Sequence, residues 1–154
     1  MWLEEHLRHS RGYGVHSPLL YRIVREAMMP HRIKGSDTSL YDALRARGVD
    51  RRTATRLQNL LTTEGYGAWK VDTVADEGEM MIATAECHDE QLRAMARSLW
   101  EQEGVLCILH PIVGRTRRRL CKELIAEHRS MSASKPTFTL LISRKDLQKQ
   151  HINI

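Results

Sequence analysis

The side chains best suited to chemistry lie in the segment Glu86-Cys87-His88-Asp89, which combines two carboxylates with a thiol and an imidazole. A cysteine beside a histidine can act as a nucleophile with its general base. His110 ends a later apolar run, so Cys87, His88 and His110 are also candidate ligands of a soft metal ion. No known ligand spacing is present, which favours a structural alternative. In that alternative Asp89 caps a helix and its neighbours line an inactive cleft.

A second group of side chains is basic. Its members recur at helical spacing and are Arg115, Arg118, Arg119, Lys122 and, further along, Arg129. The apolar residues of the same segment fall on the opposite face of the expected helix. Such a basic face can bind phosphates of a nucleic acid, or it can simply be the solvated side of a covering helix. No aromatic residue is interleaved with the basic ones, which favours the solvated face.

Both groups are positioned by a segment in which strands alternate with helices. The predicted strands are residues 69–74, 80–83, 105–109, 138–142 and 151–154, and the predicted helices are 89–103 and 116–129. This alternation predicts an α/β fold with a Rossmann-like sheet that is parallel at its centre and has helices on both faces. The last two strands follow one another without a helix, so we expect them to form an antiparallel pair.

The first part of the chain carries helical patterns instead. Ser17 and Pro18 have the types expected at an N-cap and at the first helical position, and the helix that follows ends near Pro30. Two further helices are predicted at 39–47 and 51–62, with Asp50 as the N-cap of the second. We therefore expect a helical N-terminal extension over residues 1–65 and an α/β core over 66–154, together forming one compact domain.

Two short motifs give the chain a family resemblance. One is Gly12-Tyr13-Gly14-Val15-His16-Ser17-Pro18, and the other is the ending Lys149-Gln150-His151-Ile152-Asn153-Ile154. With the strands and helix between residues 79 and 111, they resemble a group of class I S-adenosylmethionine-dependent methyltransferases. The resemblance implies a methyltransferase-type sheet with an antiparallel C-terminal strand pair, and S-adenosylmethionine as the cofactor of active members.

Three features that the resemblance implies are absent from this sequence. The family has a glycine-rich turn after its first strand, where this chain has Ala75-Asp76-Glu77-Gly78. It has an aspartate where this chain has Thr84, and an acidic pair where this chain has His110 and Pro111. The chain is therefore interpreted as a shortened, degenerate relative, for which we predict no catalytic residue, no metal and no cofactor. The residues left as candidates for a remnant cleft are Asp76, Gly78, Glu86, His88 and His110.

The first two predicted strands, 69–74 and 80–83, are very close in sequence. A parallel crossover takes about a dozen residues or more, so we expect Asp76-Glu77-Gly78 to be the turn of an antiparallel hairpin. A sheet edge that has lost its covering strands tends to pair with another copy of the chain. The sequence therefore predicts a homodimer formed through this edge.

Composition places few limits on function. The 154 residues carry a net charge of +5, and no apolar run approaches the roughly 18 to 20 residues of a membrane span. Acidic residues occupy the positions where a signal peptide has basic ones, so a cytoplasmic protein without a membrane partner is expected. The three cysteines form no CxxC pair and are predicted to be reduced, buried thiols.

Three hypotheses of function follow. The first is an inactive methyltransferase-like protein that acts as an interaction or regulatory module, with an unidentified protein as partner. The second is a methyltransferase or small-ligand binder that uses a remodelled cleft, with S-adenosylmethionine as cofactor if it is active. The third is nucleic-acid binding through the basic helix 115–129.

Overall fold

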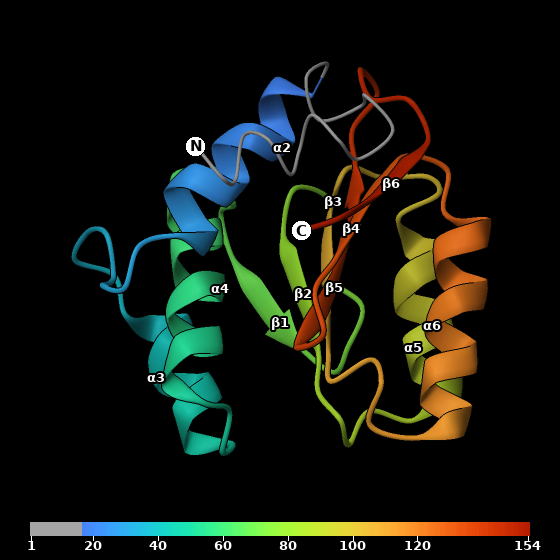
Figure 1. Cartoon of the computed structure of the whole chain (residues 1–154), viewed down its shortest axis with the longest axis horizontal. Coiled ribbons are helices and arrows are strands. Elements are labelled where there is room, and N and C mark those ends of the chain that lie inside the picture. The colour runs from blue at the N-terminus through green and yellow to red at the C-terminus, as the bar shows by residue number, and fades with distance from the viewer. Residues whose placement is uncertain (1–16) are drawn as a thin grey trace. The chain divides into compact units, whose positions relative to one another are not determined.

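The computed structural model describes residues 17–154, and this part of the chain separates into two compact units divided between Tyr66 and Gly67. Residues 12–16 of the N-terminal motif lie outside the described residues. The first unit is helical (Figure 1). Its elements are α2 (Pro18–Ile23), the π-helical η2 (Val24–Met28), α3 (Ser39–Ala46) and α4 (Arg51–Thr63).

Two helices of this unit begin at side-chain caps that the sequence predicts. The Ser17 hydroxyl accepts a hydrogen bond from the Leu20 backbone N–H at 3.2 Å, and Pro18 occupies the first helical position. The Asp50 carboxylate accepts from the Thr53 N–H at 2.9 Å. Each side chain satisfies a backbone donor that has no partner within its helix, so both predicted caps are confirmed.

Two arginines of α4 donate hydrogen bonds to backbone carbonyls near the end of η2. Arg52 donates to the carbonyl oxygens of Pro30 at 2.6 Å and Met28 at 3.0 Å, and Arg56 donates to Met28 at 3.0 Å. These carbonyls lie at the end of η2 and just beyond it, where backbone acceptors lack intrahelical donors, and the half-buried guanidinium groups of Arg52 and Arg56 bind them. The side chains of Arg52 and Arg56 are thus structural.

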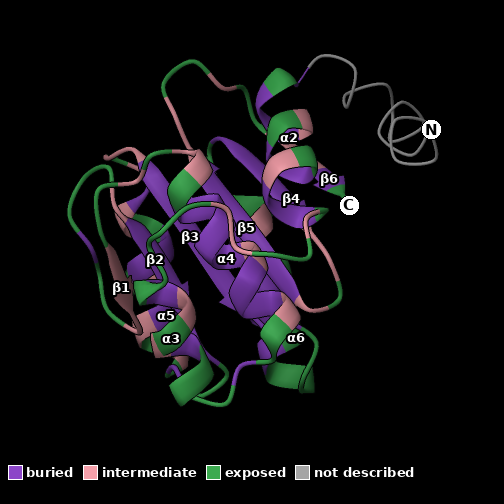
Figure 2. Cartoon of the chain, turned by 90° about the vertical axis from the view of Figure 1, so that its left-hand side faces the viewer, coloured by how far each residue is buried: buried purple, intermediate pink, exposed green. Residues whose placement is uncertain are grey.

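The second unit contains a sheet and two helices. Its elements are β1 (Trp69–Val71), β2 (Met80–Ala83), α5 (Asp89–Ser98), β3 (Gly104–Leu109), α6 (Arg115–Glu127), β4 (Met131–Ser134), β5 (Phe138–Ser143) and β6 (Gln150–Asn153). Every residue of β2 and β3 is buried, as the continuous apolar runs of the sequence predict. Figure 2 shows β3 and β5 as buried strands of this sheet.

The six strands lie in the order β1-β2-β3-β5-β4-β6. The pairs β1–β2, β2–β3 and β4–β6 are parallel, whereas β5 is antiparallel to both of its neighbours, β3 and β4. The predicted α/β class with a mixed sheet is confirmed. The predicted pairing of the last two strands is wrong, because β4 was not predicted and it separates β5 from β6.

The two helices of this unit, α5 and α6, lie on the same face of the sheet (Figure 1). A single apolar cluster joins Met95 of α5 and Leu124 of α6 to Met81, Leu106 and Leu141 of three strands. Topology explains this arrangement. The crossovers β2–α5–β3 and β3–α6–β4 move across the sheet in the same direction, so crossovers of one hand place both helices on the same side.

The expected hairpin between the first two strands is also wrong. β1 and β2 are parallel, with Trp69 opposite Met80 and Val71 opposite Ile82. β1 ends at Val71, three residues earlier than predicted, which leaves residues 72–79 for the connection. Strands of three or four residues are only about 10 to 13 Å long, and eight residues can span that distance without a helix.

Candidate functional site

The structure divides the five cleft candidates between opposite ends of the sheet. Glu86 and His88 follow the carboxyl end of β2, and His110 follows that of β3. Asp76 and Gly78 instead lie just before β2, where the Gly78 N–H donates to the Glu103 carbonyl at 2.9 Å. Since the strands are parallel, these two residues lie at the amino end of the sheet and do not join the other three.

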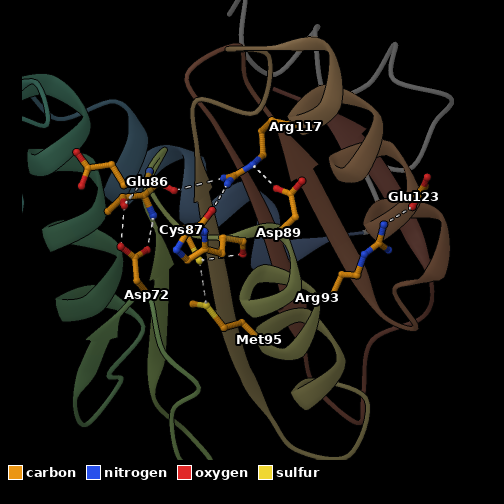
Figure 3. Close-up of polar contacts among 10 residues, drawn as sticks. Asp72, Glu86, Cys87, Asp89, Arg93, Met95, Arg117 and Glu123 are labelled. Carbon is orange, nitrogen blue, oxygen red and sulfur yellow. Dashed lines mark hydrogen bonds and ion pairs between the residues drawn. The ribbon is translucent and has the colours of Figure 1, made fainter.

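At the carboxyl end, one buried arginine holds the segment that contains the cysteine and histidine. The Arg117 guanidinium of α6 donates to the backbone carbonyls of Thr84, at 3.3 Å, and Cys87 (Figure 3). Its Nε lies 3.5 Å from a carboxylate oxygen of Asp89. The Arg117 side chain is only 9% exposed, so its two bonds to backbone carbonyls act where water competes little. The loop after β2 is therefore fixed to α6.

Asp72 makes a second connection across the same end of the sheet. Its carboxylate accepts hydrogen bonds from the Thr84 backbone N–H and the Thr84 hydroxyl, both at 2.7 Å. Asp72 has a left-handed φ of 59°, which turns the chain away at the end of β1. Figure 3 shows this carboxylate directed at the loop after β2. The two bonds link the carboxyl ends of the parallel strands β1 and β2.

Cys87 is poorly suited to act as a nucleophile. Burial, together with the nearby Asp72 carboxylate, raises the pKa of this thiol to about 11. The thiolate is the reactive form, so almost none is present near neutral pH. The sulfur lies 4.0 Å from the Met95 sulfur and packs as an apolar group (Figure 3). Burial also raises the pKa of Cys107 and Cys121.

Asp89 does not cap α5 as the sequence suggests. The residue before it, His88, is the N-cap and makes no side-chain capping bond. Asp89 is the first residue of the helix, where a carboxylate interacts favourably with the positive end of the helix dipole. Instead of capping the helix, the Asp89 carboxylate forms an ion pair with Arg117.

An open hollow with a volume of about 720 Å³ lies beside this loop. It is lined by residues 85–90 and 114–117, and therefore by the N-terminal ends of both α5 and α6. The lining residues include the acids Glu86, Asp89 and Glu90 and the bases Arg115 and Arg117. The volume lies in the range of small-molecule sites, and the charges would suit a ligand with both signs.

The possible metal ligands do not form a metal site. In residues 17–154, no three His, Cys, Asp or Glu side chains gather closely enough to hold a metal ion. His88 lines the hollow, whereas His110 is not among its lining residues. His110 has a left-handed φ of 50°, and its backbone N–H donates to the Thr137 carbonyl at 3.0 Å. The two exposed imidazoles therefore belong to different loops, one after β2 and the other after β3.

The basic residues lie on α6 as the sequence predicts, with four of them exposed on its outer face: Arg115, Arg118, Arg119 and Lys122. Arg129 follows the helix, and its guanidinium carbon lies 4.3 Å from the centre of the Trp100 ring. Arg97 lies 5.8 Å from the same ring. Tertiary structure thus places an aromatic residue beside Arg129 that the sequence of α6 does not contain.

Arg117 and Asp72, the two residues that hold the loop after β2, were not among the residues predicted from the sequence. Arg117 had a detectable signal, because its spacing to Leu120, Cys121 and Leu124 places it on the apolar face of α6. An arginine at a core position needs buried acceptors, which indicates a structural ion pair or clamp. Asp72 gave a weaker signal, as an acid immediately after a strand.

No protein-family model matches this chain, and no curated protein or solved structure shows significant similarity to it. The fold and site therefore define it as an α/β protein with a six-stranded mixed sheet and a clamped loop at the carboxyl end of β2. Among the described residues, no helix combines the length and the apolar character needed to cross a membrane.

Proposed function

We propose that this chain is a catalytically inactive relative of class I methyltransferases that acts as an interaction module. The observation that carries this proposal is the clamp at the carboxyl end of the sheet. Doubly wound sheets bind ligands at this end, and here Arg117 and Asp72 are bonded to Thr84, Cys87 and Asp89 of the chain itself. Polar groups engaged within the protein are not available to a cofactor.

Two features of the sheet support the methyltransferase ancestry in this proposal. β5 is an antiparallel strand near the C-terminus of an otherwise parallel sheet, in keeping with the resemblance of the sequence. The connection from β1 to β2 contains no helix, although an active member places a glycine-rich turn and a helix after its first strand. In the proposed descent from a methyltransferase, this part of the cofactor site was therefore lost.

Titration calorimetry with S-adenosylmethionine and S-adenosylhomocysteine tests the proposal. We expect no saturable heat from either compound at concentrations well above those that occupy an ordinary cofactor site. The matched control is Thr84→Val, which removes the hydroxyl that donates to one carboxylate oxygen of Asp72 and should likewise show no saturable heat. Micromolar binding to the unmodified chain, lost on Asp72→Asn, would show that an unconventional cofactor site exists and would refute the proposal.

A second candidate function is small-ligand binding in the hollow beside α5 and α6. The observation in its favour is the combination of a volume of about 720 Å³ with opposite charges around the rim. A screen of small zwitterionic metabolites by thermal shift would detect such binding. Arg115→Ala should weaken it, whereas Arg119→Ala, on the same helix but not among the residues that line the hollow, should not.

The proposed module works as a cytoplasmic homodimer. β1 and β6 are the outermost strands of the sheet. On either side of β1, the Ala68 carbonyl and the Asp72 N–H form hydrogen bonds with β2. Successive residues of a strand direct their backbone polar groups to opposite sides, so the Val71 N–H points to the open edge. A second copy could pair there, although an edge of three residues offers few hydrogen bonds.

A further inference from the structure

The connection between β3 and α6 exposes two adjacent aliphatic side chains. Ile112 is 57% exposed and Val113 is 65% exposed. The Val113 N–H donates to the His110 carbonyl at 3.1 Å, and the His110 N–H donates to the Thr137 carbonyl. The turn is thus held by backbone hydrogen bonds, and it presents both side chains to solvent. Two adjacent exposed aliphatic side chains on a hydrogen-bonded turn can enter an apolar environment together, and they carry an argument when a second feature lies beside them.

The exposed face of α6 begins immediately after this turn and is basic. Its side chains are Arg115, Arg118, Arg119 and Lys122, and none of them has an ion pair or hydrogen bond among residues 17–154. Several other basic residues of this unit are paired, among them Arg93 with Glu123 and Arg144 with Asp146. The four cations follow the spacing i, i+3, i+4, i+7 and so form one stripe opposite the buried face.

We propose that this surface docks on an anionic membrane. Ile112 and Val113 enter the boundary between headgroups and acyl chains, while the four basic side chains bind anionic headgroups. Interfacial binding needs this combination of apolar insertion and electrostatic attraction, because neither contribution is sufficient alone. The inference rests on the proposed function, since it names the partner of a chain that acts by binding. The proposal replaces the expectation of a protein without a membrane partner, because the absence of a long apolar run bears only on spanning a membrane.

Charge complementarity alone would also suit a nucleic acid, but two observations favour the lipid surface. Exposed aliphatic side chains gain nothing from a phosphate backbone, whereas a bilayer interface buries them. The aromatic residue near the stripe, Trp100, is covered by the guanidinium of Arg129 at 4.3 Å. A ring that stacks on an arginine is not free to stack on a base.

Cosedimentation of the full chain with vesicles tests the proposal. Vesicles of phosphatidylcholine with about one-third phosphatidylserine are compared with pure phosphatidylcholine at about 0.1 M salt. We expect binding only to the phosphatidylserine vesicles. Arg118→Glu with Arg119→Glu should lower the partition coefficient at least about twentyfold, at roughly fivefold per basic residue. Ile112→Ser with Val113→Ser should lower it at least about fivefold.

Matched controls separate these effects from net charge and folding. Arg25→Glu with Arg51→Glu makes the same change in net charge on exposed residues of the helical unit, and should leave the binding unchanged. Met29→Ser with Val74→Ser removes two other exposed apolar side chains, and it too should bind as the unmodified chain does. Circular dichroism verifies that each variant is folded.

Three outcomes would overturn the proposal. They are equal binding to both kinds of vesicle, unchanged binding of the Ile112→Ser, Val113→Ser variant, and tight binding to a single-stranded oligonucleotide that depends on Arg118 and Arg119 while vesicle binding is absent. The last result would identify a nucleic acid as the partner. Failure here would leave the proposed inactivity intact, because cofactor titration measures that property separately.

Discussion

Arg117 is buried, although arginine side chains are mostly exposed in folded proteins. It lies on the buried face of α6 and donates to the carbonyls of Thr84 and Cys87. We expect Arg117→Met to lower the free energy of unfolding by about 2 to 3 kcal/mol, because two buried acceptors lose a charged donor. Arg118→Met, one residue along on the exposed face, should change it by less than about 0.5 kcal/mol. Urea unfolding measures both, and equal effects would contradict the clamp.

Cys87 gives a prediction that depends on pH. Burial raises the pKa of its thiol to about 11, so the thiolate fraction near pH 8 is roughly a hundredfold below that of a free cysteine. Iodoacetamide should therefore modify Cys87 at least about tenfold more slowly in the folded chain than in denaturant. The folded state also binds this proton more tightly, so stability should decline as the pH rises toward 11. Peptide mapping by mass spectrometry follows the modification, and rapid reaction near neutral pH would restore the nucleophile hypothesis.

At the scale of elements, β3 is the strand on which the rest of the sheet depends. It pairs with β2 on one side and β5 on the other, and Ile108 is fully buried at its centre. We expect Ile108→Asp to abolish soluble expression, because it buries a charge without a partner. The control is Ile112→Asp, which makes the same change at a position that is 57% exposed. Soluble, folded Ile108→Asp protein would show that this strand is not central.

The elements that the sequence predicted best are those with local signals. Ser17 and Asp50 mark helix starts, and the apolar run of β3 is apparent without any tertiary information. β4 was missed because Met131–Ser134 has only two apolar residues, and its two serines weaken the strand pattern. Ser132 is nevertheless buried, and its hydroxyl lies 2.7 Å from the His151 Nδ1, so the partner that allows it to be buried comes from β6.

At the scale of the whole molecule, the predicted homodimer is tested by the mass of the protein in solution. Sedimentation velocity should give a mass of twice 17.8 kDa. Val71→Pro removes the N–H that points to the open edge while keeping the bonds of β1 to β2, and should yield a monomer. Lys70→Ala changes an adjacent side chain without removing a backbone donor, and should remain dimeric. A monomeric unmodified chain would contradict pairing through β1.

The sequence by itself determined the α/β class, most of the helices and strands, the caps at Ser17 and Asp50, and the basic face of α6. These features depend on periodicity and on contacts within a few residues, which a linear pattern records. Only the tertiary structure decided the order of the strands, the shared face of α5 and α6, and the separation of Asp76 and Gly78 from His88. It also decided the clamp by Arg117. Such features depend on which distant segments meet, and strand order cannot be read from local pattern.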